Sequence, residues 1–190
     1  TTKKNVEILR VLGADVKIIT EPDPETGEYL QSRIKKVKEL LEVTPNSFWT
    51  NQYSNINNAN AHYDTASEII NSLDGNLDYL FCATSSCGTI RGVAEYVNRH
   101  NPQTKIIGVD AVGSAIFGHK IKKRIIPGHG STIVPPLLKS EIVDDVVHVT
   151  DWDCVVGCRK LIKKEGILVG GSSGAVMSAA EKFSKNIRKD

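Results

Sequence analysis

Small and hydroxyl-bearing residues fill a loop between a predicted strand and a predicted helix near the middle of the chain. The loop follows the apolar run 77–83 and consists of Ser85, Ser86, Cys87, Gly88 and Thr89. Small residues let the backbone approach an anion, hydroxyls donate hydrogen bonds, and the first N–H groups of a helix add a favourable dipole. The loop lacks the lysine of a nucleotide-binding P-loop and the spacing of G-x-G-x-x-G. It is a candidate phosphate site, although a serine-rich helix cap would look much the same.

A second junction of the same kind lies near the end of the sequence. There the short apolar run 167–169 leads into Gly170, Gly171, Ser172, Ser173 and Gly174, and a helix of small residues follows. Paired glycines allow a flat group to lie close to the backbone, but tight turns favour glycine and serine as well. Because ligands of open α/β folds bind at the carboxyl ends of the strands, two such junctions in one parallel sheet indicate a shared ligand site.

The elements that must position these loops alternate along the chain. Apolar periodicity predicts helices at 6–12, 30–41, 59–73, 89–97, 152–165 and after 174, and strands at 15–19, 48–53, 77–83, 105–110, 142–149 and 167–169. Strands separated by helices predict an α/β fold with an open parallel sheet and helices on both faces. Residues 111–140 are rich in Gly and Pro and lack periodicity, which is typical of a functional loop.

The composition excludes several classes of protein. Of the 190 residues, 40% are hydrophobic and 24% charged, and the formal charge is only +2, so we expect an ordered globular protein without a nucleic-acid partner. No apolar stretch approaches the ~20 residues of a membrane span, and a signal-peptide core is missing, which predicts a cytoplasmic protein without a membrane partner. The cysteines at 82, 87, 154 and 158 form no C-x-x-C pair, so we expect reduced, packed thiols and no metal.

Five motifs in order resemble those of cysteine synthases and cystathionine β-synthases, which are pyridoxal-phosphate (PLP) enzymes of fold type II. The stretch NQYSNINNANAHYDTASEI is similar to the family's Q-F-x-N-P-x-N-x-x-x-H-Y/F-x-T-x-x-E-I. SSCGT, KIIGVDAVGS, PGHG and EGILVGGSSGA follow where the family has its phosphate loop and three later glycine-containing motifs. The resemblance implies the tryptophan synthase β-like fold, here incomplete, and pyridoxal 5'-phosphate as the cofactor.

The resemblance also implies roles for individual residues. The cofactor phosphate would bind Ser85, Ser86, Cys87, Gly88 and Thr89, Gly128 would lie near the ring, and Ser172 would meet the pyridine nitrogen. A neutral hydroxyl there does not enforce a charged pyridinium, which suits β-elimination to an aminoacrylate followed by addition of a nucleophile. Gln52 would hold the substrate carboxylate.

The segment YLQSRIKKV resembles the branch that makes the 2,3-diaminopropionate precursor of siderophores from O-phosphoserine and glutamate. Arg33 would hold a carboxylate of the amine nucleophile, or it snorkels along the apolar face of its helix; both readings stay open. Tyr53, where simple cysteine synthases usually carry Phe, adds polarity near the second substrate. We expect β-replacement on O-phosphoserine or O-acetylserine by an amine such as L-glutamate; the alternatives are a cysteine synthase that uses sulfide and a non-catalytic module of the same fold.

The Schiff-base lysine of this family, in its S-x-K-x-R context, does not occur in these residues, so no catalytic residue is assigned within the chain. We interpret residues 1–55 as the remainder of a small mobile domain and 56–190 as most of the large PLP-binding domain, inactive alone and homodimeric in the parent protein. His62 and His148 are expected to be satisfied or surface groups, and contact of His129 with substrate is left open. A helix N-terminus could lower the pKa of Cys87, without a catalytic role.

Overall fold

The computed structural model describes residues 3–25, 27 and 29–187. In chain order its elements are α1 (Lys3–Val11), α2 (Tyr29–Val43), α3 (Ile56–Asn60), α4 (His62–Ser72), β1 (Tyr79–Ala83), α5 (Gly88–His100), β2 (Lys105–Ala111), the 3-10 helix η1 (Ser140–Ile142), β3 (Asp145–Val149), α6 (Asp151–Glu165) and α7 (Gly171–Ser184). The chain divides into two compact units, residues 1–50 and 51–190. The assignment of residues 1–55 to a small mobile domain stays a prediction.

The second unit contains a parallel sheet in the order β1-β2-β3, as the alternating pattern predicts. Phe81 of β1 lies beside Ile107 of β2, and Val109 of β2 lies beside Val147 of β3. All three strands come from apolar runs, which is typical of parallel strands that are covered on both faces. Their carboxyl ends therefore lie at one edge of the sheet.

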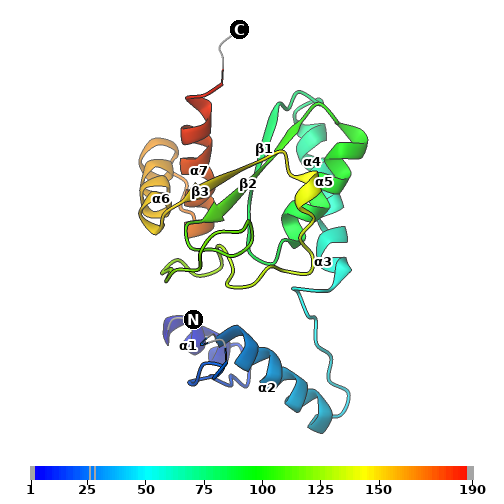
Figure 1. The fold of residues 1–190 in the computed structure, drawn as a ribbon, viewed down its shortest axis with the longest axis vertical. Coiled ribbons are helices and arrows are strands. Elements are labelled where there is room, and N and C mark those ends of the chain that lie inside the picture. Colours follow the sequence, from blue (N-terminus) through cyan, green and yellow to red (C-terminus); the bar gives the residue numbers. More distant parts are fainter. Residues whose placement is uncertain (1–2, 26, 28, 188–190) are drawn as a thin grey trace. The chain divides into compact units, whose positions relative to one another are not determined.

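Helices cover both faces of this sheet, with α4 and α5 on one side and α6 and α7 on the other (Figure 1). Side chains of β1 alternate between the two faces because successive residues of a strand point in opposite directions. Leu80 and Cys82 join a core cluster with α4 and α5. Phe81 points the other way and meets the ring of Phe183 on α7, with the ring centroids 5.5 Å apart.

Three predicted strands are not formed. Residues 15–19, 48–53 and 167–169 have extended or turn backbone outside any sheet. A strand persists only when a neighbour pairs its N–H and C=O groups, and no such neighbour exists among the residues that the structure describes. The predicted helix 59–73 also differs, because the chain turns at Ala61 and separates α3 from α4.

The helices α6 and α7 approach at backbone distance because glycine occupies both sides of the contact. A Cβ added to Gly157 would lie 2.0 Å from the carbonyl oxygen of Gly174, and one added to Gly174 would lie 2.1 Å from that of Cys154. Cys154 is buried in this contact, and the thiol of Cys158 donates to the carbonyl of Gly170 at 3.3 Å. Both cysteines therefore pack as predicted, and no cluster suited to a metal ion occurs among the described residues.

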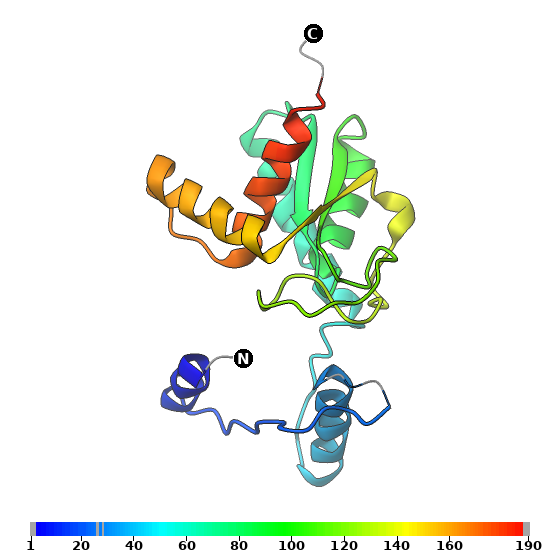
Figure 2. The ribbon, with the colours of Figure 1, turned by 60° about the vertical axis from the view of Figure 1, so that its left-hand side comes forward.

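The irregular segment between β2 and β3 begins at the carboxyl end of β2 and is held by specific bonds (Figure 2). The carboxylate of Asp151 accepts from the backbone N–H groups of Ile125 at 3.0 Å and Ile126 at 3.1 Å. The N–H of Gly130 donates to the carbonyl of Thr84, just after β1, at 2.7 Å. These bonds bring the PGHG turn beside the loop that follows β1.

In the described part of the chain, no helix has the length and apolarity of a membrane span.

Candidate cofactor site

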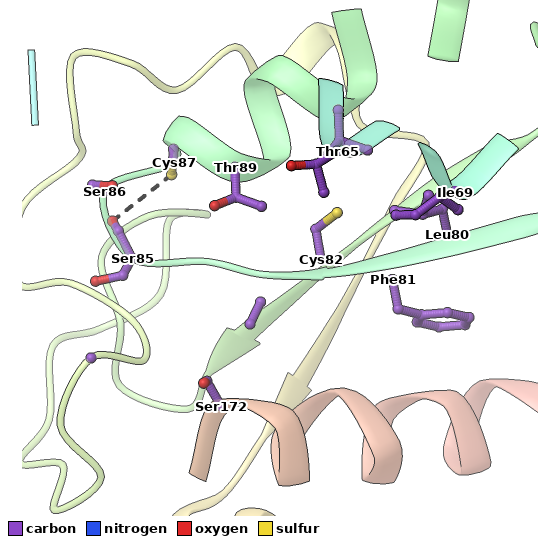
Figure 3. A pocket seen from close by; sticks show the side chains of 13 residues that line it. Thr65, Ile69, Leu80, Phe81, Cys82, Ser85, Ser86, Cys87, Thr89 and Ser172 are labelled. Carbon is purple, nitrogen blue, oxygen red and sulfur yellow. Dashed lines mark hydrogen bonds between the residues drawn. The ribbon is translucent and has the colours of Figure 1, made fainter. Parts of the chain in front are cut away.

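A cavity of about 400 Å³ lies at the carboxyl end of β1, within the size range of sites for small ligands. Both Gly/Ser-rich junctions, the loop after β1 and the start of α7, contribute to it (Figure 3). Of the seven residues predicted to bind a cofactor, the structure brings six to the cavity wall: Ser85, Ser86, Cys87, Thr89, Gly128 and Ser172. Gly88, the seventh, follows Cys87 directly and is the first residue of α5. Their individual binding roles stay predictions.

The loop after β1 presents unpaired donors at the start of α5. Cys87 precedes the helix in the left-handed conformation, with φ at 64°, and no side chain caps the helix. The first N–H groups of a helix have no acceptor within the helix, so those of α5 are free to bind an anion. A left-handed residue other than glycine is strained, and such strain is often found at ligand sites.

The opposite wall comes from the start of α7 and the PGHG turn. Gly170 precedes α7 without a side-chain cap, and Ser172 lies in the first turn with its side chain near the carboxyl end of the sheet (Figure 3). A Cβ on Gly171 would lie 2.5 Å from Cγ2 of Ile126, so this turn packs directly on the irregular segment. Gly128 has φ at 77° and open space where a Cβ would stand. This wall has room for a flat group beside glycine and a hydroxyl at its end.

Two side chains from the α3–α4 region contact the loop from outside the cavity. The amide of Asn58 donates to Oγ of Ser86 at 3.2 Å and to the backbone oxygen of Gln52 at 2.6 Å. Nε2 of His62 lies 3.0 Å from Oγ1 of Thr89. His62, expected to be a satisfied or surface group, thus has a hydrogen-bond partner, but its contact with this loop and that of Asn58 were missed. Both belong to the motif NQYSNINNANAHYDTASEI, which is the signal that could have found them.

A buried carboxylate, also missed by sequence reasoning, holds the end of β1 to β2. Asp110 is fully buried, and its Oδ1 accepts from the hydroxyl of Thr84 at 3.0 Å and from the N–H of Ala111 at 2.8 Å. Nε2 of His148 lies 3.9 Å from Oδ2 of this carboxylate. Burial, with His119 nearby, lowers the pKa of His148 below 6.5. The imidazole is therefore neutral near pH 7, and this contact is not an ion pair.

Three candidate residues are not among those that line the cavity. Gln52 is exposed and Tyr53 half-buried, and neither lines the cavity. Arg33 belongs to the first unit, where it is exposed and its Nε donates to the carbonyl of Tyr29 at 3.2 Å. Their roles as substrate ligands stay predictions.

His129, whose contact with substrate the sequence left open, and Cys87 are both buried. His129 is 1% exposed, does not line the cavity, and has no hydrogen-bond partner for either ring nitrogen among the described residues. Burial lowers its pKa. Burial, and secondarily the charge of Asp110, raises the pKa of Cys87 to about 12, whereas a helix N-terminus alone would lower it.

The residues present fit a flat, phosphorylated ring. Hydroxyls and free helix N–H groups at one wall suit a phosphate, and the open space at Gly128 suits the ring. The hydroxyl of Ser172 suits a ring nitrogen, because a hydroxyl can donate to it or accept from it.

Sequence comparison agrees with this geometry. The profile of the family "Pyridoxal-phosphate dependent enzyme" matches residues 1–190. The chain therefore belongs to the family of PLP-dependent enzymes. Among curated proteins it is 42% identical over 180 residues to N-(2-amino-2-carboxyethyl)-L-glutamate synthase of Ralstonia nicotianae. The match covers 94% of this chain and 53% of the relative, so the chain spans about half the length of that enzyme.

Two solved enzyme structures have a similar fold. The O-acetylserine dependent cystathionine β-synthase of Helicobacter pylori is 34% identical with a TM-score of 0.86, over 98% of this chain and 60% of the other. A hydrogen sulfide-producing enzyme of Fusobacterium nucleatum is 30% identical with a TM-score of 0.87, over 96% and 61%. The fold is thus that of the fold type II enzymes, represented here in part.

Proposed function

We propose that the protein carrying this chain replaces the leaving group of O-phosphoserine or O-acetylserine with the amine of L-glutamate. The observation that carries this proposal is the single cavity lined by the hydroxyl loop and by Ser172, in a chain similar to a glutamate-adding synthase. When bound, PLP supplies an electron sink that labilises the bonds at the α-carbon of the amino acid. The cytoplasmic location and homodimeric assembly expected from the sequence stay predictions.

The residues of this chain bind and orient the cofactor. Ser85, Ser86 and Thr89 donate their hydroxyls to the cofactor phosphate, together with the first N–H groups of α5. Gly128 leaves room for the ring. Ser172 meets the pyridine nitrogen as a neutral group, which does not enforce ring protonation and so favours elimination and addition at the β-carbon.

The substrates are held by residues outside the cavity wall. The side-chain amide of Gln52 binds the carboxylate of the serine substrate. Arg33 binds a carboxylate of glutamate through its planar fork, and Tyr53 adds a hydroxyl near the same substrate. None of the residues that line the cavity is a lysine or an acid, so proton transfer at the substrate is left to groups beyond this wall.

Sulfide is the competing nucleophile, because two structural relatives are named for sulfur chemistry. Full-length protein incubated with O-phosphoserine or O-acetylserine, and with glutamate or sulfide in turn, separates the two by mass spectrometry of the products. We expect an amine-linked product with glutamate. Turnover with sulfide alone would overturn the glutamate assignment, and protein that binds no PLP would support a non-catalytic module.

A matched pair of variants tests whether Arg33 binds the carboxylate of glutamate. We expect Arg33→Gln to raise the KM for glutamate about tenfold or more, since a charge-assisted bond to a carboxylate is worth roughly 1.5–3 kcal/mol. Lys36→Gln, on the same helix and paired with Glu39, should leave that KM unchanged. Steady-state kinetics with varied glutamate gives both values, and equal KM values for the two variants would remove Arg33 from the proposal.

A further inference from the structure

The α3–α4 junction reaches the hydroxyls of the loop after β1 with two side chains four residues apart. Asn58 donates to Ser86 at 3.2 Å, and Nε2 of His62 lies 3.0 Å from Oγ1 of Thr89. Thr89 lines the cavity, whereas His62 does not. His62 therefore acts on the cavity only through the threonine hydroxyl.

Close backbone packing fixes the position of His62. A Cβ added to Gly92 of α5 would lie 1.9 Å from the carbonyl oxygen of Ala59 and 2.9 Å from Cβ of His62. The junction thus rests directly on the backbone of α5, without side chains between. This contact between helices fixes the backbone and Cβ of His62, from which the imidazole reaches Thr89.

The hydrogens at this contact can be counted. The hydroxyl of Thr89 has one hydrogen and can also accept. If Nε2 of His62 accepts that hydrogen, none is left to donate to an anion in the cavity. If Nε2 carries a hydrogen and donates it to Oγ1, the threonine hydrogen is free to point into the cavity.

The other ring nitrogen favours the second arrangement. Nδ1 of His62 is buried and has no hydrogen-bond partner in the described part of the chain. A buried N–H without an acceptor is rarer in proteins than a buried acceptor without a donor. A neutral imidazole has one N–H, so the hydrogen belongs on Nε2, where Oγ1 of Thr89 accepts it.

We propose that His62 is a positioning residue for the cofactor phosphate: its Nε2–H donates to Thr89 and turns the threonine hydroxyl hydrogen toward the phosphate. This inference rests on the proposed binding of PLP at this loop. It does not depend on which nucleophile the enzyme uses. His62 itself touches neither cofactor nor substrate.

The test compares two amide replacements in the full-length protein. In His62→Gln the side-chain nitrogen lies about as far out as Nε2 and can still donate to Thr89. In His62→Asn the same amide is one carbon shorter and cannot reach. Apoprotein of each is titrated with PLP and with pyridoxal, which lacks the phosphate. The dissociation constant for pyridoxal divided by that for PLP isolates the contribution of the phosphate.

We expect His62→Asn to lower this ratio about tenfold, because one hydrogen bond to a charged group is lost, and His62→Gln to stay within about threefold of the original. His100→Asn, a histidine at the far end of α5, is the matched control and should leave the ratio unchanged. An unchanged ratio in His62→Asn, or equal losses for PLP and pyridoxal, would overturn the proposal.

A second measurement covers the case in which His62→Asn folds poorly. Nitrogen NMR of histidine-labelled holoenzyme should show His62 as the Nε2–H tautomer, with the His62→Gln variant identifying its signal. An Nδ1–H tautomer would contradict the proposal. Neither measurement uses a substrate, so a wrong assignment of the nucleophile leaves both results unaffected.

Discussion

Cys87, which precedes α5, and Thr89, in the first turn of that helix, lie two residues apart, yet their side chains meet different surroundings. Thr89 is exposed to the cavity and contacts His62, whereas Cys87 is 3% exposed and belongs to the core cluster with α4 and α5. The dipole of α5 would lower the pKa of a thiol at this place. Burial outweighs it and raises the pKa of Cys87 to about 12. The thiol therefore packs, and the hydroxyl is available for binding.

This difference predicts the order of thiol reactivity. At pH 8, iodoacetamide should leave Cys82 and Cys87 unmodified in the folded protein, because burial raises the pKa of both to about 12. Cys158, the one cysteine of the four that is not buried, should be labelled first. Mass spectrometry of peptides from the alkylated protein gives the order, with urea-unfolded protein as the control. Early labelling of Cys87 would show that the loop opens.

Glycine decides how closely the elements pack. Gly157 and Gly174 let α6 and α7 touch at their backbones, and Gly92 does the same for α5 and the α3–α4 junction. Such contacts leave little freedom in the distance between helices, because backbone atoms cannot rotate away as side chains do. The first turn of α7, which carries Ser172, is placed by one of these contacts.

The α6–α7 contact predicts a large loss of stability when one methyl group is added at Gly174. Gly174→Ala would put its Cβ 2.1 Å from the carbonyl oxygen of Cys154, so the helices must separate. We expect a loss of about 3 kcal/mol in the free energy of unfolding, the upper end of the range for overpacked cores. Ser173→Ala, its exposed neighbour in the same turn, should change stability by less than about 0.5 kcal/mol. Urea unfolding measures both, and similar values would contradict the close contact.

At the scale of the whole second unit, a partly buried carboxylate joins segments that are far apart in sequence. Glu95 on α5 accepts from Tyr63 on α4 at 2.5 Å, from Arg91 at 3.1 Å, and from Lys139 just before η1 at 2.6 Å. Burial alone would raise the pKa of Glu95, but these hydrogen bonds outweigh it and lower the pKa to about 2. The network thereby holds the end of the irregular segment against α5.

The carboxylate of Glu95 should make the free energy of unfolding depend on pH in the acidic range. Since the folded pKa lies below the ordinary 4.5, the stability that Glu95 provides is full above about pH 4.5 and is lost as the pH falls toward 2. The shift corresponds to about 3 kcal/mol, as an upper value because Lys139 is 39% exposed to screening water. Urea unfolding between pH 7 and pH 3 should show a smaller decline in Glu95→Gln than in the original protein. The exposed Glu68→Gln serves as the control, and parallel declines in all three would exclude the network as the cause.

Local pattern predicted the parts of this molecule that depend on neighbours in sequence. The apolar runs around β1, β2 and β3 and the two Gly/Ser-rich junctions are visible without coordinates, because burial on both faces and tight turns impose characteristic residue types. The same reasoning was wrong for residues 15–19, 48–53 and 167–169, where apolar residues suggested strands. Whether an extended segment becomes a strand depends on a pairing partner elsewhere in the chain, which composition does not reveal.

The sequence by itself indicated the family, the three paired strands with helices between them, and six of the residues that line the cavity, since each leaves a mark in local spacing. Only the tertiary structure decided that His62 meets Thr89, that Asp110 bonds to Thr84, and that burial makes Cys87 unreactive. These facts depend on distances between residues far apart in the chain. Such distances are set by how closely backbones pack, as at Gly92, and helical or strand periodicity carries no information about them.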